Sequence, residues 1–144
     1  MALYAFDGTW NDSRDPSRDR TLDTNVWRFF EQYKGTENCD KFYLDGVGSR
    51  KGCMGRLIGG LTGAGAAVRV REQFQKLQEQ FQKGDSVIDI VGYSRGAAIA
   101  RLFVQHIEAH FEQITCGQTR LSQPPTVRFL GLFDTVASFG VPWR

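Results

Sequence analysis

One serine in this 144-residue sequence stands in a pattern that could make it a nucleophile. Ser94 is the middle residue of Gly92-Tyr93-Ser94-Arg95-Gly96, which has the form G-x-S-x-G. In a nucleophile elbow this turn joins a strand to a helix and exposes the serine on a strained backbone, and glycines avoid the collisions that side chains would make there. Ser94 is therefore the candidate nucleophile, and Gly92 and Gly96 are the candidate structural residues of its turn.

The segments on either side of the motif supply the context that an elbow requires. An apolar run rich in β-branched residues, 87–91, precedes the motif, and an Ala-rich helical pattern, 97–111, follows it. A strand, a tight turn and a helix in this order favour the elbow. The alternative interpretation is an ordinary strand-turn-helix crossover that contains a coincidental serine.

A serine hydroxyl needs a base, which is normally an imidazole oriented by a carboxylate. Asp134 follows the apolar run 127–133 and comes after Ser94, in the chain order of an α/β-hydrolase triad. We therefore take Asp134 as the candidate triad acid. The competing interpretation is an Asp that forms a local turn.

The two histidines of the chain do not suit the role of the base. His106 and His110 both fall on the helical pattern that begins after the elbow. At a rise of about 1.5 Å per residue they lie roughly 18 and 24 Å from Ser94 along the helix axis. The sequence therefore predicts that the triad histidine is absent from this chain.

Backbone N–H groups near the serine are the candidates for stabilising an oxyanion. The N–H of Arg95 directly follows the nucleophile at the start of the helix. A second donor is expected from the loop after the first strand, at Gly8 or Thr9. Asp7 either braces that loop or is a turn former without a chemical role.

Strands and helices alternate along the chain and must position these residues. The predicted strands are the apolar runs 2–6, 41–45, 87–91 and 127–133. Alternation of strands and helices indicates a mainly parallel sheet with helices on both faces, a three-layer αβα fold of the α/β-hydrolase type. The polar loops that follow the strands then meet at one edge, where ligands bind in such sheets; they read DGTWND, DGVGS, GYSRG and DTVASFG.

Two more helices are predicted from their caps and apolar stripes. The first is capped by Thr24 or Asn25 and ends at Gly35. The second stops at Gly84, and its apolar residues follow the spacing of a single helical stripe: Val70, Phe74, Leu77 and Phe81. Residues 115–125 are predicted to form a polar loop.

Length and composition place the chain in one domain, residues 1–144, without a metal site or cofactor. A net charge of +2 gives no argument for nucleic acid, and three widely spaced cysteines lack metal-ligand spacing. No leader or membrane-spanning run is recognisable, which favours a cytoplasmic protein in the producing cell. A nucleotide site in the glycine-rich segment 52–65 is disfavoured because no P-loop or dinucleotide pattern is present.

The conjunction of motifs along the whole chain resembles one known family. It comprises FDGTWND, TNV, YLDGVGS, the glycine-rich segment, VGYSRGAAIAR and GLFDTVASFG, in that order. Together they resemble the α/β-hydrolase domain of the type VI secretion phospholipase effectors, whose relatives were long catalogued as a domain of unknown function. The resemblance implies hydrolysis of phospholipid acyl esters with Ser94 as nucleophile and Asp134 as triad acid.

The same resemblance implies a later histidine-bearing segment that this sequence does not contain. We therefore expect the amino-terminal part of a hydrolase, incomplete at its C-terminal end, with a partner chain or a missing C-terminal segment completing the sheet and the triad. A lipid or another ester is the expected substrate, and export through a type VI system would need no signal peptide. The alternative is a catalytically inactive or split-hydrolase remnant that acts as a binding module.

Overall fold

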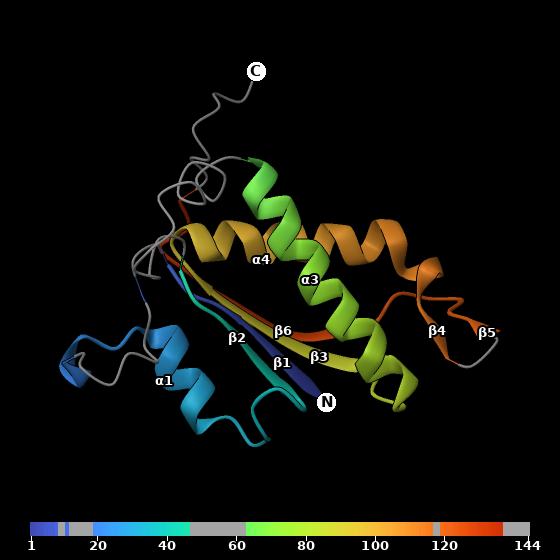
Figure 1. The fold of residues 1–144 in the computed structure, drawn as a ribbon, viewed down its shortest axis with the longest axis horizontal. Coiled ribbons are helices and arrows are strands. Elements are labelled where there is room, and N and C mark those ends of the chain that lie inside the picture. The colour runs from blue at the N-terminus through green and yellow to red at the C-terminus, as the bar shows by residue number, and fades with distance from the viewer. Residues whose placement is uncertain (9–10, 12–18, 47–62, 117–118, 137–144) are drawn as a thin grey trace.

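A four-stranded parallel sheet forms the centre of the molecule (Figure 1). The computed structural model describes residues 1–8, 11, 19–46, 63–116 and 119–136. The sheet has the order β2-β1-β3-β6, and each neighbouring pair is parallel. Its strands are β1 (Ala2–Phe6), β2 (Lys41–Leu44), β3 (Val87–Tyr93) and β6 (Thr126–Phe133).

Helices cover both faces of the sheet, which confirms the predicted three-layer α/β fold. Helix α1 (Asn25–Gln32) packs on one face, and α3 (Gly63–Gln82) and α4 (Arg95–His110) pack on the other (Figure 1). Two 3-10 turns, Arg20–Leu22 and Phe111–Gln113, precede α1 and follow α4.

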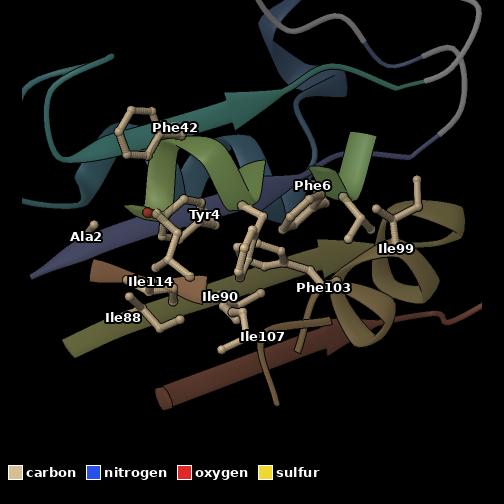
Figure 2. Packing of buried hydrophobic residues seen from close by; sticks show 14 of the residues in the cluster. Ala2, Tyr4, Phe6, Phe42, Ile88, Ile90, Ile99, Phe103, Ile107 and Ile114 are labelled. Carbon is tan, nitrogen blue, oxygen red and sulfur yellow. The ribbon is translucent and has the colours of Figure 1, made fainter. Parts of the chain in front are cut away.

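The buried strands divide their side chains between two apolar clusters, since successive residues of a strand point to opposite faces. On β1, Tyr4 and Phe6 join the α3–α4 side, whereas Leu3 and Ala5 join the α1 side. Figure 2 shows the larger cluster, in which the rings of Tyr4 and Phe6 pack against Phe103 of α4. This packing fixes α4, and with it the turn at its N-terminus, against the sheet.

The predicted start of α1 and the predicted stripe and stop of α3 are confirmed, whereas α1 ends at Gln32 with Tyr33 as its C-cap, before the predicted end at Gly35. The Thr24 hydroxyl caps α1 by accepting a hydrogen bond from the N–H of Trp27 at 3.1 Å. All four residues of the predicted α3 stripe are buried against the sheet and α4. Gly84 ends the α3 region with a φ of +90°, a left-handed conformation that favours glycine.

The structure differs from the sequence prediction in residues 115–125. In place of a plain loop, β4 (Thr115–Cys116) and β5 (Thr119–Arg120) pair antiparallel. Two-residue strands are too short to show the period-2 pattern from which strands are predicted. The difference lies far from the edge that carries the candidate site.

Candidate active site

The carboxyl ends of the four strands meet at one edge of the sheet, as predicted. The register aligns Phe6 of β1 with Leu44 of β2 and with Gly92 of β3, and it aligns Tyr93 with Phe133 of β6. The residues that directly follow the strands therefore lie at this edge: Asp7, Asp45, Ser94 and Asp134.

Ser94 has the backbone conformation of a strained turn residue. Its φ of 55° and ψ of −121° match the first central position of a type II′ turn, which normally takes glycine. The residue lies directly between β3 and α4, where its N–H donates to the carbonyl of Phe133 at 2.9 Å. A non-glycine residue in this region costs about 1–3 kcal/mol and persists where the surroundings impose it.

The two glycines of the motif are required by close backbone contacts. A Cβ on Gly92 would lie 2.6 Å from Cα of Ala97. A Cβ on Gly96 would collide with the carbonyl oxygens of Phe6 and Asp7. The sequence argument for these glycines thus has a steric counterpart in the structure.

The hydroxyl of Ser94 and the nearest amide groups have no hydrogen-bond partner in the part of the chain that the structure describes. Within the described residues, Oγ of Ser94 makes no hydrogen bond, and the N–H groups of Arg95 and Gly96 have no acceptor. The 16-residue helix α4 begins here, so its macrodipole places partial positive charge beside the serine. This partial positive charge would stabilise an anion that forms on a group bonded to Ser94.

Asp134 directly follows the last residue of β6 and is exposed. Because Tyr93 and Phe133 are register partners, Ser94 and Asp134 are the next residues of adjacent strands. Asp134 has a φ of 46°, and two residues later the N–H of Val136 donates to the carbonyl of Ser94 at 3.2 Å. The structure thus brings the two residues to neighbouring positions, and the role of Asp134 as triad acid stays a prediction.

The loop after β1 packs against the elbow. A Cβ on Gly8 would lie 2.6 Å from the ring of Tyr93, the residue before the serine. The Gly8 N–H donates to Oδ1 of Asp7 at 2.7 Å. Its role as an oxyanion donor stays a prediction, and Thr9 lies outside the described residues.

Three residues at this edge were not assigned to the candidate site from the sequence. Asn11 connects two strand ends: its N–H donates to the Gly8 carbonyl at 3.1 Å, and its own carbonyl accepts from Gly46 at 2.9 Å. Thr24 and Tyr43 both donate hydrogen bonds to Asp7. These contacts join residues far apart in the chain, and only the helix-cap signal at Thr24 marked any of them.

The histidines lie near the other end of α4, away from Ser94. Their rings stack on each other with centroids 4.1 Å apart, and His106 also meets the ring of Phe74 on α3 at 4.8 Å. Nδ1 of His110 lies 2.9 Å from the His106 carbonyl. Both histidines belong to the α3–α4 contact.

No set of metal ligands assembles in the part of the chain that the structure describes. Three or more His, Cys, Asp or Glu side chains never gather there in a group that could hold a metal ion. The glycine-rich segment 52–65 falls mostly outside this part, as does Cys53. Cys39 is a free, exposed thiol.

The parallel sheet and the strained serine between β3 and α4 define a fold of the α/β-hydrolase type. The sequence matches the family described as "T6SS, Phospholipase effector Tle1-like, catalytic domain" over residues 3–111, and the chain belongs to this family. Membership supports a hydrolase of phospholipase or esterase type among the effectors of type VI secretion. The matched range includes Ser94 and α4, whereas β6 and Asp134 lie beyond it. No curated protein and no solved structure matches the chain.

Proposed function

We propose that this domain hydrolyses acyl-ester bonds of a lipid with Ser94 as the nucleophile. The observation that carries the proposal is the backbone of Ser94, which is held at φ 55° between β3 and α4. The family supports the reaction class and a lipid as the substrate. Strain of this kind exposes a serine hydroxyl at the edge of the sheet.

In this reaction, Oγ of Ser94 bonds to the acyl carbonyl carbon while a base takes the hydroxyl proton. The carbonyl oxygen becomes an oxyanion, which the Arg95 N–H and the α4 dipole stabilise. The leaving alcohol takes the proton as the C–O bond breaks, and water then hydrolyses the acyl-serine. A second donor is proposed from the loop at Gly8 or Thr9, next to the hydrogen bond that the Gly8 N–H donates to Asp7.

Asp134 is the proposed acid that orients the base, because it follows β6 beside the elbow. The base is a histidine supplied from outside the 144 residues. This assignment is supported by the position of His106 and His110, whose rings pack in the α3–α4 contact. A partner chain or a further segment of polypeptide would bring that histidine.

The test uses a fluorophosphonate probe, which reacts with activated serines, and measures the adduct on Ser94 by intact mass and peptide mapping. Free imidazole is added over a concentration series, because it can replace a missing histidine side chain as the base. We expect labelling of Ser94 that increases with imidazole. The Ser94→Ala variant corrects for any reaction elsewhere on the protein.

Asp134 is tested in the same assay. The Asp134→Asn variant should respond less to imidazole, because the amide cannot stabilise an imidazolium. Glu108→Gln, at an exposed position on α4, is the matched control and should respond like the wild type. An absence of adduct on Ser94 at every imidazole concentration would overturn the proposal.

We also propose that residues 1–144 act as one domain. Support comes from β1 and β6, which belong to one sheet although they lie at opposite ends of the described chain. The proposed route is synthesis in the cytoplasm followed by export through a type VI system. No helix within the described ranges has the length and apolar character needed to cross a bilayer.

A second candidate function is that of a non-catalytic interaction module. The observation in its favour is the outer edge of β6, which pairs with β3 alone among the described strands. Phe129 and Leu130 on β6 are 42% and 40% exposed. Strands with an open edge accept a strand from another chain. Association through β6 without any labelling of Ser94 would favour this function over hydrolysis.

A further inference from the structure

A buried carboxylate lies at the active edge and has no role in the mechanism above. Asp7 is 4% exposed and follows the last residue of β1. An ionised carboxylate at such a depth is costly unless hydrogen bonds compensate for the lost water. The hydrogen-bond partners of Asp7 therefore show which parts of the fold its carboxylate stabilises.

Among the described residues, three donors from different segments bind the Asp7 carboxylate. The Gly8 N–H donates to Oδ1 at 2.7 Å. The hydroxyls of Thr24 and Tyr43 donate to Oδ2 at 2.7 and 2.6 Å. Thr24 also caps α1, and Tyr43 belongs to β2. One side chain thus holds together the loop after β1, the start of α1 and the adjacent strand.

The backbone that Asp7 holds is also the surface on which the elbow rests. The first turn of α4 approaches the carbonyls of Phe6 and Asp7 so closely that Gly96 has no room for a Cβ. Gly8 also lies close to the ring of Tyr93, next to Ser94, since a Cβ on Gly8 would come within 2.6 Å of that ring. A shift of residues 6–8 would therefore change the contacts of the elbow at Tyr93 and at Gly96.

We propose that Asp7 is a positioning residue for the reaction at Ser94. Its carboxylate fixes residues 6–8 through its hydrogen bonds with Gly8, Thr24 and Tyr43, and residues 6–8 in turn hold the elbow and the first turn of α4. The inference rests on the proposed function for its effect on rate. Its structural part, the coupling of Asp7 to the elbow, stands apart from catalysis.

The experiment compares two buried carboxylates that each accept a hydrogen bond from a tyrosine hydroxyl. Asp7 accepts from Tyr43, and Asp89 accepts from Tyr33 at 2.9 Å. Asp89 is 1% exposed and lies within β3, with Arg128 as its ion-pair partner, so it matches Asp7 in burial but not in contact with the elbow. The variants are Asp7→Asn and Tyr43→Phe, with Asp89→Asn and Tyr33→Phe as controls.

Each variant is measured for melting temperature, for amide hydrogen exchange over residues 88–100, and for labelling of Ser94 with imidazole present. We expect Asp7→Asn to slow labelling by about 10- to 100-fold, since small displacements of a reacting group have effects of this size. Tyr43→Phe, which removes the hydrogen bond to Asp7 and keeps the ring, should slow labelling less. Both should speed exchange at 94–98, whereas the controls should lower the melting temperature and leave labelling of the folded protein unchanged.

The readouts separate the two proposals. Faster exchange at 94–98 in Asp7→Asn but not in Asp89→Asn supports the coupling of Asp7 to the elbow. This holds even if Ser94 of the wild type is never labelled, because absence of labelling overturns only the proposed function. Unchanged exchange at 94–98 in Asp7→Asn overturns the positioning role. Labelling that falls only in proportion to the melting temperature in all four variants overturns it as well.

Discussion

At the scale of single residues, the elbow combines two features. Ser94 has a strained backbone, and Gly92 and Gly96 pack so closely against neighbouring backbone that neither has room for a Cβ. The strain arises because the peptide on one side belongs to β3 and the peptide on the other begins α4. The strained backbone of Ser94 lowers the free energy of unfolding, and a glycine at the same position would adopt this conformation without strain. Relief of the backbone strain at Ser94 should stabilise the protein, whereas a side chain added at Gly96 should destabilise it.

Replacing Ser94 by glycine should stabilise the protein. We expect Ser94→Gly to raise the free energy of unfolding by about 1 kcal/mol, because glycine adopts φ 55° without steric cost. The measurement is denaturant unfolding followed by circular dichroism. Ser94→Ala is the control, since it removes the hydroxyl and keeps the strain; equal stability of the two variants would contradict the prediction.

Gly96 should tolerate alanine much less well than Gly84 does. Gly96→Ala forces a methyl group against the carbonyls of Phe6 and Asp7, and we expect a loss of about 3 kcal/mol. Gly84 has a φ of +90° with open space around it, so Gly84→Ala should cost only about 1 kcal/mol. Thermal unfolding of the two variants compares a steric clash with a conformational cost, and a larger loss for Gly84→Ala would refute the distinction.

At the scale of elements, α4 carries the elbow at one end and the histidine pair near the other. His106 lies against α3, where it meets the ring of Phe74. Burial, followed by the charges of His110 and Arg71, lowers the pKa of His106 below its ordinary value. The α3–α4 contact is therefore sensitive to pH although it lies outside the proposed reaction.

The sign of this effect gives a pH prediction. Below the unfolded pKa of about 6.5, the unfolded chain binds a proton at His106 more readily than the folded protein does. The contribution of neutral His106 to the free energy of unfolding is thus complete above this pH, and it is lost as the pH falls towards the lowered pKa of the folded protein. We expect His106→Gln to reduce the loss of stability between about pH 7 and about pH 5.5.

Denaturant midpoints at the two pH values provide the measurement. His110→Gln is the control: it should keep much of the pH dependence, because burial is the larger cause of the His106 shift. An identical pH dependence in the wild type and in His106→Gln would show that His106 does not contribute.

At the scale of the whole molecule, the sheet is protected unevenly. Helices cover β1 and β3 on both faces, whereas β6 leaves Phe129 and Leu130 about two-fifths exposed. A bulge between Ile88 and Asp89 of β3 places an extra residue, Arg128, on β6, and its guanidinium pairs with Asp89. The bulge changes the register locally, but beyond it β6 continues pairing with β3 as far as Phe133.

Among the described strands, the outer edge of β6 has no partner, so we expect association that depends on concentration. A lysine on an edge strand opposes strand addition, so Leu130→Lys should shift the mass distribution towards the monomer. Leu22→Lys is the control, because Leu22 is 65% exposed but lies in the 3-10 turn before α1. Light scattering after size exclusion measures the mass; a wild type that stays monomeric at all concentrations would contradict the expectation.

Much of the fold was predictable because its signals are local. The four strands follow apolar runs, α1 begins at a capping threonine, and the apolar residues of α3 recur at helical spacing and are buried. The β4–β5 pair was missed because two residues carry no periodic signal. The bulge at Arg128 was missed because it depends on register with β3, which the sequence of β6 alone does not state.

The sequence by itself determined the elbow and the edge at which the strands end, because backbone preferences of glycine and apolar periodicity act within a few residues. The tertiary structure alone decided which side chains meet at that edge. The Asp7 carboxylate accepts hydrogen bonds from Thr24 and Tyr43, which lie 17 and 36 residues away in the sequence. Asn11 connects the loops that follow β1 and β2. Such contacts depend on strand order, register and helix packing, which are properties of the assembled sheet.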